Sequence, residues 1–122
     1  MSIYKDIILD HYRNPRHNDL PNNSKFTINV DNPLCGDIIT LGLNIKNNRI
    51  KDIGFVGKGC AISIASASML YDYALDKNIS DLQKLDSSFM LNMLGIELTP
   101  NRLKCALLSL EALTKILCQI KI

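Results

Sequence analysis

The first hydrophobic positions of the chain recur three or four residues apart, as on one face of an α-helix: Ile3, Tyr4, Ile7, Ile8 and Tyr12. This short amphipathic helix should end at Asn14-Pro15, because the residue before a proline avoids the α-helical region. The polar segment 13–25 contains two prolines and several asparagines. It is typical of a loop that crosses the protein surface.

Three segments with alternating hydrophobic and polar residues follow, and each predicts a strand with one apolar face. The apolar positions are Phe26, Ile28 and Val30 in the first, Ile39, Leu41, Leu43 and Ile45 in the second, and Ile53 and Phe55 in the third. Asn47-Asn48 separates the second and third segments, and asparagine tolerates the positive φ of a tight hairpin turn. These two strands should therefore pair antiparallel.

Helical spacing returns after Gly57-Lys58-Gly59, with a helix rich in small residues expected from about residue 61 to residue 75. Ser80 is expected to cap a short helix, and Gly95 to end another. Thr99-Pro100 should open the last helix. Its largely apolar stripe is predicted at Leu103, Leu107, Leu110, Thr114, Leu117 and Ile120. This order predicts an α+β fold, in which a small three-stranded antiparallel sheet has helices packed on its apolar face.

Composition places the chain among globular proteins that can bury a core. Its 122 residues are 47% hydrophobic and 21% charged, and we expect one domain over residues 1–122. The net charge of +2 does not indicate a nucleic-acid partner. No apolar run is long enough to span a membrane, and the charged amino terminus is untypical of a secreted protein. We therefore expect a cytoplasmic protein with reduced thiols.

Two of the four cysteines lie in glycine-containing segments where one element ends and the next begins. Cys35 lies in a turn between two predicted strands, with Asp37 two residues further along. Cys60 directly precedes a predicted helix, whose amino terminus stabilises a thiolate, and Lys58 adds a nearby positive charge. Both thiols are therefore candidates for binding a metal or attacking sulfur.

Cys105 lies in the first two turns of the last predicted helix, where Arg102 and Lys104 again favour the thiolate. The spacing of Cys35, Cys60 and Cys105 matches no zinc-finger or ferredoxin pattern, so a shared site would have to be assembled by the fold. The alternative is that these cysteines are small buried hydrophobic residues. The glycine-flanked positions of the first two favour the chemical interpretation.

Other candidates have plain structural interpretations. Cys118 should lie about 20 Å along the last helix from the third cysteine, too far to share its metal. Asp37 is either a turn residue that bonds its own backbone or an oxygen ligand. His11 and His17 are interpreted as surface or packing residues, because neither has the spacing of a metal ligand.

These residues give the chain a resemblance to the IscU/SufU/NifU amino-terminal family of iron–sulfur cluster assembly proteins over nearly its whole length. Four segments carry it: Ile8–Arg16, Asn32–Asp37, Gly57–Ser63 and Arg102–Ala106. Matched position by position, the resemblance implies that the metal or cluster is held by Cys35, Asp37, Cys60 and Cys105. Cys118 matches no ligand of the family.

The resemblance also implies a function. Members of this family accept sulfur from a pyridoxal-phosphate cysteine desulfurase (SufS, IscS or NifS type), bind iron and hold a transient [2Fe–2S] cluster for apo acceptor proteins. Zinc often occupies the same positions. On this basis we expect a scaffold protein, with Cys35 as the candidate persulfide acceptor and Cys105 as the alternative acceptor.

The chain departs from both main branches of the family. Lys104 stands where the IscU branch usually has histidine, which is similar to SufU, yet the interval from Cys60 to Cys105 is too short for the usual SufU insertion. Glu97–Asn101 replaces the segment that binds a dedicated Hsp70 chaperone in IscU, so we do not expect that partner. A zinc-dependent sulfurtransferase, which would make the chain an enzyme, is the second hypothesis. A purely structural zinc module is the third, and the glycine-flanked ligands argue against it.

Overall fold

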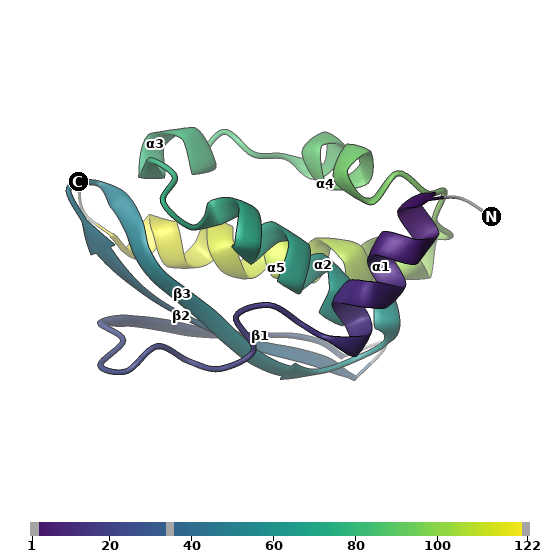
Figure 1. Cartoon of the computed structure of the whole chain (residues 1–122), viewed down its shortest axis with the longest axis horizontal. Helices are drawn as coiled ribbons and strands as arrows, with labels where there is room; N and C mark the ends of the chain where they lie inside the picture. Colours follow the sequence, from purple (N-terminus) through teal and green to yellow (C-terminus); the bar gives the residue numbers. More distant parts are fainter. Residues whose placement is uncertain (1–2, 34–35, 121–122) are drawn as a thin grey trace.

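The structure is a computed structural model that describes residues 3–33 and 36–120. The elements follow in the order α1 (Ile3–Arg13), β1 (Phe26–Asn32), β2 (Asp37–Lys46), β3 (Arg49–Lys58), α2 (Ala61–Ala74), α3 (Ile79–Leu82), α4 (Ser87–Leu94) and α5 (Pro100–Gln119). The strands form one antiparallel sheet in the order β1-β2-β3, with the helices on one side (Figure 1). The predicted α+β architecture is confirmed. Within the described ranges, no helix has both the length and the apolar character to cross a bilayer.

The main core lies between the sheet and helices α2 and α5. The alternating apolar residues of the strands point into it and are at most 5% exposed: Val30, Ile39, Leu41, Leu43, Ile53 and Phe55. The ring of Tyr71 in α2 meets the ring of Phe55 edge-on, with their centroids 5.5 Å apart. The period-two pattern therefore identified the buried face of the sheet correctly.

The loop between α1 and β1 lies on the outer face of the sheet. A Cβ atom at Gly54 would stand 1.8 Å from the carbonyl oxygen of Asp19, so only glycine lets the loop backbone approach this closely. At Gly42, a Cβ atom would stand 3.0 Å from the Oγ of Ser24 and 3.1 Å from the Cδ2 of Leu20. The predicted surface-crossing loop is confirmed, and it fills space that two strand glycines leave open.

The outer edge of β3 is bonded to segments that are not strands of the sheet. The Ile50 amide donates to the carbonyl oxygen of Lys77 at 3.1 Å, and the Asp76 amide donates to the carbonyl oxygen of Ile50 at 2.9 Å. Further along, the Phe55 amide donates to the carbonyl oxygen of His17 at 2.9 Å. Both the loop before β1 and the segment after α2 therefore satisfy backbone groups along this edge.

The turns agree with the sequence in most places. Asn47 and Asn48 have φ values of 55° and 62°, as the tight β2-β3 hairpin requires, and Gly95 ends α4 with a φ of 66°. The prediction for Ser80 is wrong. The cap of α3 is Asn78, whose Oδ1 accepts a hydrogen bond of 3.0 Å from the Ser80 amide.

The apolar stripe predicted for α5 is partly wrong. Leu110 and Leu117 are buried, but Leu107 is only partly buried and Thr114 is exposed. The buried face consists of Cys105, Ala106, Leu108, Ser109, Leu110, Ala112, Leu113, Ile116 and Leu117. Because α5 packs against α2 as well as β1 and β2, its buried face is broader than a single stripe and is centred elsewhere.

Candidate metal centre

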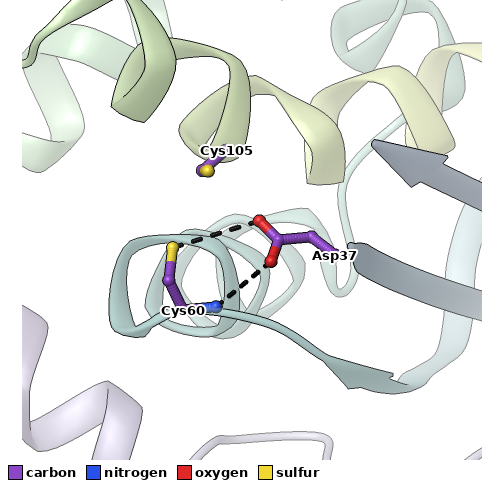
Figure 2. A group of neighbouring side chains, drawn as sticks. All are labelled: Asp37, Cys60 and Cys105. Atoms are coloured by element: carbon purple, nitrogen blue, oxygen red, sulfur yellow. Dashed lines mark hydrogen bonds between the residues drawn. The ribbon is translucent and has the colours of Figure 1, made fainter. Parts of the chain in front are cut away.

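Three of the predicted site residues meet at one end of the sheet, although they come from separate parts of the chain. Asp37 is the first residue of β2, Cys60 is the amino-terminal cap residue of α2, and Cys105 lies in the first turns of α5. One ligand atom from each residue lies within 4.8 Å of the other two. Figure 2 shows the carboxylate of Asp37 beside Cys60, with Cys105 facing this pair from α5.

The Asp37 carboxylate is fixed by the start of α2. Its Oδ1 accepts a hydrogen bond of 3.3 Å from the backbone amide of Cys60, and its Oδ2 lies 4.0 Å from the Sγ of Cys60. Cys60 makes no side-chain capping bond to α2, so a carboxylate from β2 satisfies an amide that would otherwise lack a partner in the helix. The positive end of the helix dipole also favours a negative charge here.

The three side chains border an open pocket of about 320 Å³. Its other lining residues are Gly36, Gly59, Asn101 and Arg102. Asp37 and Cys105 are each 3% exposed, whereas Cys60 is partly exposed. The thiol of Cys60 is therefore the more accessible of the two described thiols at this site.

Two further residues of interest are the predicted ligand Cys35 and the basic residue Lys104, which the sequence places beside Cys105. Cys35 lies outside the described residues, so its place in the site remains a prediction, although Gly36 next to it in the chain lines the pocket with a φ of 73°. Lys104 does not belong to the set of described residues around this pocket. It borders a separate hollow of about 300 Å³ together with Asp31 and Glu111.

The plain structural interpretations of the two histidines are confirmed. The Nδ1 of His11 lies 2.7 Å from the Oγ of Ser68 on α2, and the Nε2 of His17 lies 3.0 Å from a carboxylate oxygen of Asp72. Both histidines therefore bind the end of α1 and the following loop to α2. Cys118 is exposed near the carboxyl end of α5, whereas Cys105 lies near the amino end of that helix.

The donor set suits zinc and iron. Zinc takes thiolate sulfur at about 2.3 Å and carboxylate oxygen at about 2.0 to 2.2 Å, usually with four ligands in a tetrahedron. Ligand atoms of one tetrahedral ion are then roughly 3.5 to 3.8 Å apart. The Oδ2 of Asp37 lies 4.0 Å from the Sγ of Cys60, and one donor atom from each of the three residues lies within 4.8 Å of the other two, so small side-chain movements would bring them onto one ion. These three donors leave a fourth position for another ligand.

Sequence reasoning missed two residues of the pocket. Asn101 precedes Cys105 by four residues, which places both on one face of α5 about one helical turn apart. That spacing is a signal the sequence contains. Gly59 has no side chain and lines the pocket with its backbone. Only the fold shows that the Asp37 carboxylate lies against it.

The protein belongs to a structural class in which an antiparallel sheet is covered by helices on one side. Its thiol and carboxylate donors are gathered at one end of that sheet. The chain belongs to the family of the NifU-like N terminal domain, whose family model matches residues 3–121. The expected family membership is confirmed.

Individual relatives agree with this assignment. The chain is 36% identical to the zinc-dependent sulfurtransferase SufU of Bacillus subtilis, over 93% of this chain and 88% of that protein. It is 34% identical to the iron-sulfur cluster assembly scaffold protein IscU 1 of Archaeoglobus fulgidus, over 93% of this chain and 73% of that protein. A solved NifU-like protein (N-terminal) from Brucella abortus shares the fold, with a TM-score of 0.79 at 21% identity over 97% of this chain and 94% of that one.

The two alignments differ in length. The alignment with SufU runs over 131 positions and that with IscU 1 over 113, although both cover 93% of this chain. SufU therefore has additional residues opposite gaps in this chain. This difference in length agrees with the expectation that the chain lacks the SufU insertion.

Proposed function

We propose that the chain is an iron–sulfur cluster assembly scaffold of the cytoplasm, acting as one domain over residues 1–122. It accepts sulfur from a pyridoxal-phosphate cysteine desulfurase, builds a transient [2Fe–2S] cluster and passes it to apo acceptor proteins. The observation that carries the proposal is the convergence of Asp37, Cys60 and Cys105 at an open pocket in a chain of this family. Cys35 completes the proposed ligand set.

Sulfur enters by thiol exchange. A thiolate of this chain attacks the outer sulfur of the persulfide on the desulfurase cysteine, the sulfur–sulfur bond of that persulfide breaks, and the desulfurase thiolate leaves. The chain then carries the persulfide. Cys35 is the proposed acceptor and Cys105 the alternative. Because Cys105 is 3% exposed, it would have to receive sulfur through the pocket rather than from the open surface.

Cluster formation needs electrons from outside. Two ferrous ions that become ferric supply two electrons, whereas two persulfide-derived sulfur atoms need four to become sulfide. A one-electron donor protein must therefore supply two more. The thiolates bind the product strongly, while the Asp37 carboxylate is the weakest ligand for a soft iron–sulfur centre. This weak ligand is where a thiol of an acceptor protein can enter.

The alternative function is a zinc-dependent sulfurtransferase, which Lys104 favours because the family resemblance makes a lysine at this position similar to SufU. A histidine at this position could offer a nitrogen ligand, but a protonated lysine cannot, so Asp37 would be the one non-thiolate ligand in the proposed set. In this alternative, zinc stays bound while one cysteine accepts the persulfide. The zinc-dependent relative from B. subtilis makes this the appropriate second candidate.

One anaerobic experiment separates the two functions. The zinc-loaded chain is incubated with desulfurase, cysteine, ferrous iron and an electron donor, while visible absorption and bound zinc are measured together. A scaffold should gain [2Fe–2S] absorption as it loses zinc. Stoichiometric zinc that remains bound, with strong stimulation of the desulfurase and no cluster absorption, would instead establish the sulfurtransferase.

A further inference from the structure

Gly59 occupies the position where a side chain would collide with the Asp37 carboxylate. A Cβ atom at residue 59 would lie 3.0 Å from Oδ1 and 3.1 Å from Cγ of Asp37, and 3.1 Å from the Cβ of Ser63. All three separations are shorter than an ordinary van der Waals contact. The crowded oxygen is the one that accepts the hydrogen bond from the Cys60 amide.

Glycine is needed at this position because a side chain would have too little room, and not because the backbone conformation requires it. Gly36 and Gly95 are the described glycines with positive φ, so residue 59 has a backbone that other residues adopt. Of the crowded groups, the Cβ of Ser63 is fixed to α2, whereas the Asp37 carboxylate is the end of a rotatable side chain and can move. An added methyl group should therefore displace the carboxylate rather than disrupt the fold.

We propose that Gly59 is a positioning residue for the Asp37 ligand. Its missing side chain lets Oδ1 rest on the Cys60 amide, which leaves Oδ2 on the side where Figure 2 shows Cys105. One carboxylate oxygen thus holds the start of α2 while the other remains available to a metal ion. This inference rests on the proposed function, because it concerns the same ligand set.

A double-mutant cycle tests the proposal through zinc affinity, measured by competition with a chromophoric chelator. Gly59→Ala should weaken zinc binding roughly 10-fold, the loss typical when a residue that orients a metal ligand is changed. Asp37→Ala should also weaken it. If Gly59 acts through Asp37, adding Gly59→Ala to Asp37→Ala should cause no further loss.

Gly42→Ala is the matched control. Its Cβ atom would be as crowded, at 3.0 Å from the Oγ of Ser24, but it lies on the outer face of the sheet. This variant should bind zinc like the original chain. The absorption spectrum of bound cobalt(II) provides a second measurement, in which Gly59→Ala should shift the bands in the same direction as Asp37→Ala.

The outcomes are distinct. An equal loss of affinity from Gly59→Ala with and without Asp37, or no loss at all, would overturn the inference and leave the proposed function intact. Unchanged affinity in Asp37→Ala itself would remove Asp37 from the ligand set and so contradict the inference, while the proposed function would still be tested by cluster formation on the cysteines. Failure of metal-free Gly59→Ala to fold would also contradict the inference, because the carboxylate is expected to yield before the fold does.

Discussion

The hydroxyl group of Tyr71 donates a hydrogen bond of 2.8 Å to the main-chain carbonyl oxygen of Ser109. Both residues are fully buried, and they belong to α2 and α5 respectively. Burial raises the pKa of Tyr71 far above its ordinary value, so the hydroxyl remains a donor at any pH the protein meets. The bond therefore links the helix that follows Cys60 to the helix that carries Cys105.

Replacing Tyr71 with phenylalanine should remove this link while keeping the ring. We expect a loss of about 1 kcal/mol in the free energy of unfolding. The corresponding fall in melting temperature is roughly 4 °C for a domain of this size. Tyr73→Phe is the control, because Tyr73 is 40% exposed. Equal melting temperatures for Tyr71→Phe and the original chain would show that the bond contributes nothing to stability.

Gly54→Ala should be one of the most destabilising small substitutions in the sheet. The new Cβ atom would overlap the backbone oxygen of Asp19, and a backbone atom cannot rotate away as a side chain can. We expect a loss of about 3 kcal/mol or more in urea unfolding, as for overpacked cores. Gly42→Ala, where the crowding atoms belong to side chains, should lose distinctly less. The reverse order would show that the loop does not depend on Gly54.

Acid should weaken the attachment of α1 to α2 through His11. Burial lowers the pKa of His11 below its ordinary 6.5, and the nearby Arg16 adds to this effect, whereas Asp10 and Asp72 oppose it. The folded state therefore disfavours the proton. The stabilisation is complete above pH 6.5 and falls as the pH drops below this value, where the unfolded chain takes up a proton first.

Urea midpoints measured at pH 7.5 and pH 5.5 check this expectation. The midpoint of the original chain should be lower at the acidic pH, and His11→Gln should reduce the difference between the two values. A difference that is the same in both proteins would assign the acid sensitivity to other groups.

Asp37→Ala should still build a cluster, since the cysteines remain, but should release it several-fold more slowly. The reason is that the variant lacks the weak oxygen ligand through which an acceptor thiol enters the site. Transfer of the cluster to an apo-ferredoxin, followed by circular dichroism, measures the rate. Transfer as fast as in the original chain would limit Asp37 to its hydrogen bond with the Cys60 amide.

Cys118→Ser should leave both zinc content and sulfur acceptance unchanged. Cys118 is exposed and lies about four helical turns beyond Cys105. Cys105→Ser should lower the zinc content, because it removes one of the gathered donors. Metal analysis of the two purified variants under anaerobic conditions makes the comparison. Loss of zinc from the Cys118 variant would contradict the ligand assignment.

Local sequence signals predicted the elements well. The alternation from Ile39 to Ile45 defined the buried face of β2, and Asn47-Asn48 defined the hairpin, because both effects act between near neighbours in the chain. The prediction of the apolar stripe on α5 was less accurate, because the local pattern does not reveal that α5 packs against α2 as well as against the sheet.

The site shows the same division between local and tertiary information. The flanking residues and the family resemblance selected Asp37, Cys60 and Cys105, but no spacing between them indicates that they meet. The contact of Gly59 with a carboxylate 22 positions earlier in the chain exists only after β2 and β3 have paired. The sequence alone therefore cannot identify a residue whose role is to leave space for another side chain.

The bonds along the outer edge of β3 also affect how the protein behaves among other chains. An exposed edge strand invites addition of a foreign strand and so promotes aggregation. Both backbone groups of Ile50 and the amide of Phe55 are already bonded within the chain. A foreign strand approaching β3 would have to displace these bonds first. The sheet can thus carry the candidate ligand residues at one end without exposing the outer edge of β3 as a template for aggregation.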